Sequence, residues 1–485
     1  MVIYTSTAEP WVIPNSDVFT FLFQQNETNA SKPVDKQFLI DDEFIHQLEI
    51  TKAKAVVTVP ALLPTLSTIC TQRGIPKERI FLFGSEEVDG YKPFYSLIDD
   101  RVIGHIEGVN PSEDIAFICF SSGTTGLPKG VMLTHRNFVA SVAQPVLQRP
   151  ENSQEDDITL GFLPFYHIYG IASLLLRAVY TRVPLVVMSR YDLETMCHLI
   201  EKYKITRAAL VPPIGCGAAP LNREHIDAFK ERLGKSIKQG YGLTETTGGC
   251  FFQDVEESED LIPGSSGKLI PHMEAKIVDE NGKGKKDKMT LVSKNECPDV
   301  TSALLIVKAL GPGFEGELLL RGPQIMKGYL NNPKANAEIF TTDGWMRTGD
   351  IVRCDITTGE FFVLDRIKEL IKYKGNQVAP AELEALLMGR SEVADVCVVG
   401  VYDSSQATEL PRAYVVLQPF AKPTEALAAD LVAFVAANVA QHKRLRAGVQ
   451  FVDGIPKSPS GKILRREVRL WAQQEQKEIR GKGRL

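Results

Sequence analysis

A chain of 485 residues exceeds what one hydrophobic core fills, roughly 250–300 residues, so at least two domains are expected. The net charge of -5, from 60 acidic and 55 basic side chains, provides no overall basic field and argues against nucleic acid or an anionic membrane as a partner. The eight cysteines form no C-x-x-C pair, which argues against a disulfide framework and a structural zinc site and favours a reducing compartment.

The two ends of the chain can carry signals for cellular location, and such signals predict where a protein is found. The opening stretch MVIYTSTAEPWVIPNSD lacks both a basic region and an uninterrupted apolar run, and no stretch of the chain reaches ~18 apolar residues without a charge or a proline. These features predict a soluble intracellular protein with no membrane span. The final residues Gly483, Arg484 and Leu485 are a loose variant of the S-K-L peroxisomal address, so cytoplasmic and peroxisomal locations both stay open.

Apolar runs and amphipathic stretches alternate along the first part of the chain, which is the pattern of layered α/β structure rather than of a helical bundle. The expected strands cover 54–60, 114–120, 130–133 and 183–188. The expected helices cover 135–142, with Thr134 as N-cap, and 192–203. The segment 282–295 carries five lysines and few large apolar residues, so it is expected to be a solvated loop.

The pattern of strand-like and helical stretches changes near Asp365. Residues 369–375, 393–403 and 411–419 are strand-like, while 381–389 and 423–440 are helical, which predicts a compact α+β unit. We therefore expect an N-terminal domain over 1–364, a hinge over 365–368 and a C-terminal domain over 369–485. No internal repeat is visible.

The stretch SSGTTGLPKG (121–130) gathers three glycines, four hydroxyl side chains and one lysine directly after an apolar run. Backbone N–H groups freed by glycine, hydroxyl donors and an ammonium all suit an anionic oxygen cluster, so this loop is expected to hold phosphate. It is not a Walker A loop, because Gly123, Gly126 and Lys129 have the spacing G-x-x-G-x-x-K.

Four further stretches follow in order: LPFYHIYG (163–170), QGYGLTET (239–246), GWMRTGD (344–350) and PKSPSGKILRR (456–466). Together with SSGTTGLPKG, GELLLRGPQIMKGYLNNP and DRIKELIKYKGNQVAPAELE, they closely resemble the adenylate-forming superfamily of acyl-CoA synthetases, coumarate-CoA ligases, beetle luciferases and peptide-synthetase adenylation domains. The match covers most of residues 40 to 475 and looks most like the coumarate-CoA ligase and luciferase branch. It implies an α/β fold, with a large N-terminal domain of several layered subdomains and a small, mobile C-terminal α+β domain.

The resemblance implies an ATP site. The β- and γ-phosphates would be wrapped by a loop comprising Ser121, Ser122, Gly123, Thr124, Thr125 and Lys129. In the stretch that begins with Gln239 and Gly240, Tyr241 would stack on adenine, Thr244 would donate to the α-phosphate and Glu245 would hold Mg²⁺, a hard cation that prefers carboxylate oxygen. Asp350 would accept from the ribose hydroxyls, with Arg366 beside it.

The same resemblance implies which residues would bind the acid, which would contact CoA and which lysine would move between the half-reactions. The acyl pocket would be lined by His167, Tyr169, Gly217 and Ala218, although a histidine among aromatic residues is by itself more often part of a core. In the small domain, Lys372 and Gln377 would assist at the adenylate, and Lys374 and Gly375 would contact CoA. Lys462 matches the adenylation lysine, and Lys368 the hinge about which the small domain rotates between half-reactions. The catalytic set is thus His167, Thr244, Glu245, Lys372, Gln377 and Lys462.

Three departures from the family pattern concern the N-terminal domain. Residues 33–41 and the 214–215 junction look like deletions, and 282–312 looks like an insertion. A strand removed from a sheet exposes backbone donors, so the chain could be a degraded, alternatively spliced or mispredicted product.

The expected function is that of an ATP-dependent acid-thiol ligase, which converts an aromatic, hydroxycinnamic-like or medium-chain carboxylic acid to its CoA thioester through an acyl-adenylate. Its partners would be the acid, ATP and CoA, with Mg²⁺; the oligomeric state stays open. One alternative is a luciferase-like or peptide-synthetase-like adenylate former. Another is an inactive variant that retains nucleotide binding.

Overall fold

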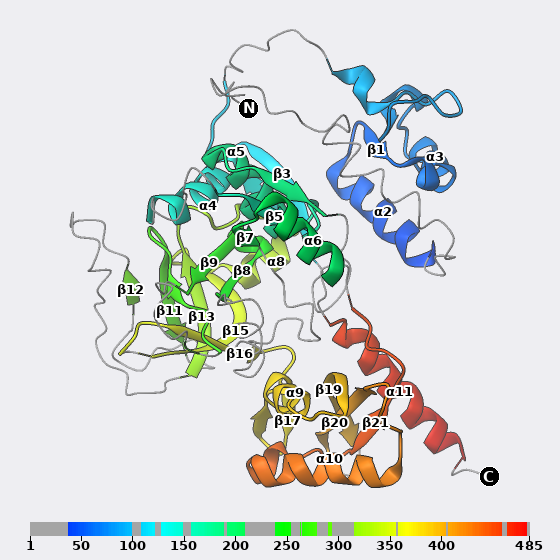
Figure 1. Cartoon of the computed structure of the whole chain (residues 1–485), viewed down its shortest axis with the longest axis vertical. Helices are drawn as coiled ribbons and strands as arrows, with labels where there is room; N and C mark the ends of the chain where they lie inside the picture. Colours follow the sequence, from blue (N-terminus) through cyan, green and yellow to red (C-terminus); the bar gives the residue numbers. More distant parts are fainter. Residues whose placement is uncertain are drawn as a thin grey trace.

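The computed structural model describes residues 37–98, 108–121, 128–148, 157–188, 192–208, 238–253, 262, 264–278, 290–292, 315–355, 357–403, 406–457 and 463–482. Within them it contains several small sheets, both parallel and antiparallel, with helices on their faces (Figure 1). This mixed α/β architecture agrees with the sequence prediction. Besides the helices and strands given below, short 3-10 helices occur at Pro60–Leu62 (η2), Lys77–Arg79 (η3), Phe94–Leu97 (η4), Thr244–Thr246 (η7) and Gln441–Lys443 (η8).

The first described unit is a small α/β layer. Its elements are α2 (Gln37–Thr51), β1 (Val56–Thr58), α3 (Leu63–Gln72) and β2 (Ile80–Leu82). The two strands are parallel, with Val56 opposite Ile80, and the helix between them buries Leu63 and Ile69 against both strands. The predicted strand at 54–60 is thereby confirmed, in shorter form.

The hairpin that carries the phosphate-loop motif forms the next sheet. Strands β3 (Ile115–Ser121) and β4 (Lys129–Thr134) are antiparallel, and β14 (Gly328–Tyr329) adds to the other edge of β4. Helix α4 (His135–Gln148) follows directly. Thr134 caps it as predicted: its Oγ1 accepts from the N–H of Asn137 at 3.2 Å, and its own N–H donates to Asn137 Oδ1 at 2.8 Å.

Helix α4 runs further than the prediction of 135–142. It passes through Pro145, which lacks an N–H and normally disfavours a helix interior. Phe138 and Val142 are buried on one face of the helix, so the packing of that face offsets the loss of one backbone hydrogen bond.

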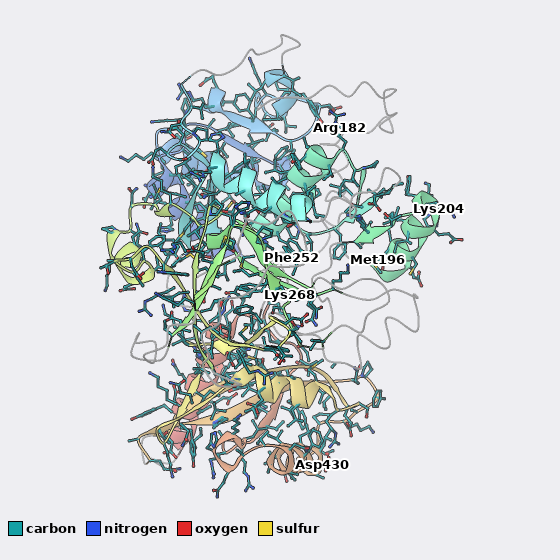
Figure 2. The ribbon with its side chains drawn as sticks, turned by 90° about the vertical axis from the view of Figure 1, so that its left-hand side faces the viewer. Arg182, Met196, Lys204, Phe252, Lys268 and Asp430 are labelled. Atoms are coloured by element: carbon teal, nitrogen blue, oxygen red, sulfur yellow. The ribbon has the colours of Figure 1, made fainter. Side chains whose placement is uncertain are left out.

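A parallel sheet comes next, with β5 (Thr159–Gly161) between β6 (Leu185–Val187) and β7 (Arg207–Ala208). Three helices connect these strands: the π-helix η6 (Gly170–Leu176), α5 (Arg177–Thr181) and α6 (Leu193–Tyr203). Figure 2 labels Met196, which is buried in α6, and the residues that end α5 and α6, Arg182 and Lys204, with φ angles of 60° and 53°. The predicted strand at 183–188 and helix at 192–203 are confirmed.

Two antiparallel sheets share one apolar core. The first has the order β10 (Lys268–Leu269), β9 (Gly248–Phe252), β8 (Gly240–Leu243). The second has the order β12 (Thr290–Val292), β11 (Glu274–Val278), β13 (Glu315–Arg321), β15 (Met346–Cys354), β16 (Phe361–Arg366). Helix α8 (Pro333–Ile339) lies between β14 and β15 in the chain. Phe252 and Lys268, opposite one another on β9 and β10, are labelled in Figure 2.

The prediction of a solvated loop over 282–295 is wrong for residues 290–292. These residues form β12 and pair with β11, Leu291 opposite Ala275. Thr-Leu-Val has high β-propensity, and it pairs with the edge of β11 that β13 does not occupy. The remainder of 282–295 lies outside the described residues.

The C-terminal unit gathers at one end of the molecule, in yellow to red in Figure 1. It contains the hairpin β17 (Ile371–Tyr373) and β18 (Asn376–Val378), a sheet of β19 (Val393–Asp403), β20 (Thr408–Leu417) and β21 (Val449–Phe451), and helices α9 (Pro380–Met388), α10 (Glu425–Asn438) and α11 (Arg465–Lys482). Its apolar core includes Leu383, Val398, Val415 and Leu431. The α+β unit expected after Asp365 is therefore present.

No helix in the described part of the chain combines the length and the hydrophobicity that a membrane span requires. The six cysteines there are all free thiols: Cys70, Cys119, Cys197, Cys250, Cys354 and Cys397.

Candidate functional site

A buried aspartate joins two of the motif stretches. Asp350, 2% exposed on β15, accepts a hydrogen bond of 2.5 Å from Tyr241 Oη of β8. Its other oxygen lies 3.2 Å from Nε of Arg366, the residue paired with it on β16. Burial and the nearby Asp350 carboxylate both raise the pKa of Tyr241 well above its ordinary value, so the phenol stays protonated and donates.

The backbone around Tyr241 needs glycine for a geometric reason. A β-bulge separates Tyr241 and Gly242 in the pairing of β8 with β9. A Cβ on Gly242 would lie 2.1 Å from the carbonyl oxygen of Gly248, so only glycine allows this close approach. The Tyr241 ring then packs on Phe251 of β9, at 5.8 Å between centroids, and Phe251 on Phe361 of β16, at 4.5 Å.

The backbone at the start of the QGYGLTET stretch (239–246) is held by Gln253. The N–H of Gln239 donates to Gln253 Oε1 at 2.8 Å, and the N–H of Gln253 donates to the carbonyl of Gln239 at 3.0 Å. Gly240 then pairs with Phe252 across the β8–β9 ladder. The backbone before Tyr241 is thus fixed to β9.

A second group joins the phosphate-loop lysine to the expected metal ligand. Tyr329 Oη donates to Glu245 Oε1 at 2.9 Å, and Nζ of Lys129 lies 4.6 Å from the centroid of the Tyr329 ring. Burial and the Glu245 carboxylate raise the pKa of Tyr329, so this phenol is also a donor. Thr244 and Glu245 lie in η7, and the Glu245 carbonyl accepts from the N–H of Met326 at 2.9 Å.

The phosphate loop connects β3 to β4, and the two residues that flank it are paired. Ser121, the last residue of β3, is opposite Lys129, the first residue of β4. The loop therefore leaves and re-enters the sheet at the same end of the β3–β4 hairpin. Its residues Ser122, Gly123, Thr124 and Thr125 lie outside the described residues.

The expected acyl residues occupy the turn before η6. The Nδ1 of His167 accepts from the N–H of Tyr169 at 3.3 Å. Burial raises the pKa of Tyr169, and the Arg177 guanidinium opposes that shift. The other two expected residues of this pocket, Gly217 and Ala218, lie outside the described residues.

The C-terminal candidates share one hairpin. Lys372 of β17 and Gln377 of β18 are opposite one another and exposed, while Lys374 and Gly375 form the turn, with φ angles of 45° and 80°. Within the described residues, no hydrogen bond or ion pair links the Lys372 and Gln377 side chains to Tyr241, Glu245 or Asp350. Lys372 and Lys374 are instead fixed through their backbone N–H groups, which donate to Glu409 and Thr408 at 2.7 Å.

The remaining two candidates concern the domain movement. The carbonyl of Lys368 accepts from Arg469 of α11 at 3.3 Å. Lys462 lies outside the described residues, between β21 and α11.

The described residues contain no group of three or more histidine, cysteine or acidic side chains that could hold a metal by themselves. Mg²⁺ in proteins usually keeps one or two carboxylates and completes its shell with substrate phosphates and water. The single Glu245 carboxylate, close to a lysine of the expected phosphate loop, fits that arrangement.

Sequence reasoning did not single out Tyr329, although GPQIMKGYLNNP contains it. Its contacts with Lys129 and Glu245 span 200 and 84 residues of sequence. The one signal available was an aromatic residue between glycine and a polar turn in a stretch that matched the family.

Two family models match the chain. The AMP-binding enzyme model matches residues 33–215 and 213–330, two segments that meet at the Ile214–Gly215 junction. The AMP-binding enzyme C-terminal domain model matches residues 382–462.

Named relatives and a solved structure agree with these matches. The chain is 35% identical to a 4-coumarate–CoA ligase of Pinus taeda over 94% of this chain and 84% of that protein. It is 36% identical to the peroxisomal OPC-8:0-CoA ligase 1 of Arabidopsis thaliana, over 88% of this chain and 77% of that protein. An O-succinylbenzoate coenzyme A synthetase from Bacillus subtilis, solved with ATP and magnesium ion, superimposes with a TM-score of 0.68 at 26% identity, covering 88% of this chain and 81% of that one. Motifs, fold and relatives thus agree, and the chain belongs to the AMP-binding, adenylate-forming enzyme family.

Proposed function

We propose that this protein is an ATP-dependent acid–CoA ligase that activates a carboxylic acid as its acyl-adenylate and transfers the acyl group to CoA. The observation that carries the proposal is the convergence of the two contact groups, Tyr241–Asp350–Arg366 and Lys129–Tyr329–Glu245. They are joined through η7, because Glu245 lies four residues after Tyr241. One group suits a nucleoside and the other suits phosphates.

In the first half-reaction a carboxylate attacks the α-phosphate of ATP, and pyrophosphate leaves. Both reactants are anions, so preoriented cations and donors supply most of the catalysis. The Lys129 ammonium would lie on the β- and γ-phosphates, together with the hydroxyls and N–H groups of the loop that starts at Ser121. The Thr244 hydroxyl would donate to the α-phosphate, where negative charge increases.

The nucleoside would lie against β8. The Tyr241 ring would cover the adenine, and the Asp350 carboxylate would accept from the ribose hydroxyls. Arg366 holds Asp350 in place from the neighbouring strand. Glu245 would hold Mg²⁺, which when bound offsets charge on the phosphates.

In the second half-reaction the CoA thiol displaces AMP from the acyl-adenylate. We propose a division into an N-terminal domain (1–364), a hinge (365–368) about Lys368 and a C-terminal domain (369–485). Rotation about the hinge would exchange Lys462, which serves adenylation, for the β17–β18 hairpin, where Lys374 and Gly375 would face CoA. Lys372 and Gln377, on the same hairpin, would assist at the adenylate.

The acid is proposed to be an aromatic, hydroxycinnamic-like or medium-chain acid, held near His167 and Tyr169. The support comes from the relatives, one named for 4-coumarate and one for OPC-8:0. Cytoplasmic and peroxisomal locations are both proposed, the second because one of these relatives is named as peroxisomal.

The test is pyrophosphate release from the full chain over a panel of aryl and alkyl acids, with and without CoA. A ligase releases pyrophosphate with at least one acid and then forms AMP and thioester when CoA is added. Pyrophosphate with no thioester would indicate an adenylate former without thiol transfer. ATP binding without pyrophosphate release for any acid would contradict the proposed function.

A further inference from the structure

Tyr329 lies between two opposite charges. Its ring faces the Lys129 ammonium at 4.6 Å, and its hydroxyl donates to Glu245 Oε1 at 2.9 Å. Within the part of the chain that the structure describes, Lys129 and Glu245 form no ion pair with each other. The cation is therefore held by the face of the ring and the anion by its hydroxyl.

Tyr329 is held by two neighbouring residues. It is 6% exposed, and its backbone pairs with Val131 across β14 and β4. The N–H of Tyr329 donates to Asn336 Oδ1 at 2.7 Å, and Nδ2 of Asn336 donates back to the Tyr329 carbonyl at 2.9 Å. A ring anchored in this way can set the positions of flexible side chains that touch it.

We propose that Tyr329 is a positioning residue that keeps Lys129 and Glu245 apart, so that the ammonium stays available to the phosphates of ATP and the carboxylate to Mg²⁺. The inference deepens the proposed function and rests on it. A lysine and a glutamate this close to a common partner would otherwise attract each other, and an ion pair between them would have to be broken whenever ATP binds. The tyrosine prevents that competition because it satisfies each charge separately.

The alternative is that Tyr329 is only a core residue. It does belong to an apolar cluster with Val131, Leu133 and Phe138. Loss of its hydroxyl would then change thermal stability but not the affinity for ATP. The two explanations therefore differ in what Tyr329→Phe does, since phenylalanine keeps the ring and removes the donor.

The experiment measures equilibrium binding of ATP to the full chain by calorimetry without any acid, once with Mg²⁺ and once with EDTA. In Tyr329→Phe, freed Glu245 turns toward Lys129, so ATP binding should weaken about tenfold in both conditions, the usual scale for one hydrogen bond to a charged group. Glu245→Gln removes the competing charge. The double variant Tyr329→Phe/Glu245→Gln should therefore bind metal-free ATP as well as Glu245→Gln alone.

Tyr414→Phe is the matched control, since Tyr414 is a fully buried tyrosine that donates to Glu475 at 3.2 Å in the C-terminal unit. It should leave ATP affinity unchanged, and melting temperatures recorded for every variant separate misfolding from weaker binding. If the unaltered chain binds ATP but Tyr329→Phe binds it equally well, the inference is overturned alone. It is also overturned if the loss persists in full when Glu245 is glutamine. An unaltered chain that binds no ATP overturns the proposed function together with this inference.

Discussion

Removal of Glu384 should destabilise the C-terminal unit strongly, because it leaves a buried guanidinium without its main partner. Glu384 accepts from both terminal nitrogens of Arg465 and from the N–H of Val398 at 2.7 Å. The two residues of the pair are only 4% and 8% exposed. In Glu384→Ala, the guanidinium keeps one carboxylate, Glu369, whose Oε2 lies 2.7 Å from Nε.

The size of the effect follows from this burial. Removing one partner of a buried ion pair costs about 3–5 kcal/mol, because the remaining charge stays desolvated. In a domain of roughly 100 residues, 1 kcal/mol corresponds to about 4–8 °C, so the unit should melt at least about 10 °C lower. Replacing all three charged residues by apolar residues of similar volume, in Arg465→Met/Glu384→Leu/Glu369→Leu, should restore most of the loss.

Temperature-dependent hydrogen exchange of β19 in the full chain measures this unit directly. Asp430→Asn is the control: its side chain is 57% exposed and pairs with Arg390 at 2.7 Å, so its loss should cost less than about 1 kcal/mol. Two results would refute the reasoning. One is an equal shift for Glu384→Ala and Asp430→Asn, and the other is a triple apolar variant as unstable as Glu384→Ala.

Three further predictions concern the catalytic residues and the hinge. Lys129→Ala should lower adenylation by about 10²–10³, the usual loss for one donor to transition-state charge, and an unchanged rate of pyrophosphate release at saturating ATP would exclude its role. Burial raises the pKa of Asp365 from 3.8 to about 7, so protonation of its carboxyl group favours the folded state. This contribution to the free energy of unfolding is complete below pH 3.8 and is lost as the pH rises through about 7. Wild type should therefore lose unfolding free energy relative to Asp365→Asn between pH 5 and pH 8, by at most about 1.4 kcal/mol per pH unit, and parallel curves from denaturant titrations would contradict this. Lys462→Ala should abolish acyl-adenylate formation yet still convert supplied acyl-adenylate to the thioester; equal losses of pyrophosphate and AMP release would mean that the lysine does not alternate.

The elements that the sequence predicted well are those whose apolar pattern is decided locally. Residues 393–403 are strand-like and form β19, and Thr134 caps α4 through a contact only three residues away. Residues 290–292 behaved differently, because their strand depends on a free edge of β11 that lies in another segment. Helix α4 likewise continues beyond Pro145, because packing against other segments offsets the missing backbone hydrogen bond. The sequence of the helix alone does not show that packing.

The candidate site shows the same division. The pairing of Asp350 with Arg366 joins neighbouring strands and was expected from the family pattern. The hydrogen bond from Tyr241 to Asp350 spans 109 residues, and no local pattern announces it. Tyr329 was overlooked for this reason, since its importance lies in two contacts and not in its own stretch.

The nucleotide residues come together through the apolar layer beneath them. Tyr241 packs on Phe251, Phe251 packs on Phe361, and Phe361 lies on the strand that ends at Arg366. These contacts join the β8–β9 sheet to the β15–β16 sheet, so the 2.5 Å hydrogen bond between Tyr241 and Asp350 depends on two aromatic side chains that would never touch ATP. Three polar residues from distant stretches can therefore form one site because a continuous core fixes the sheets that carry them.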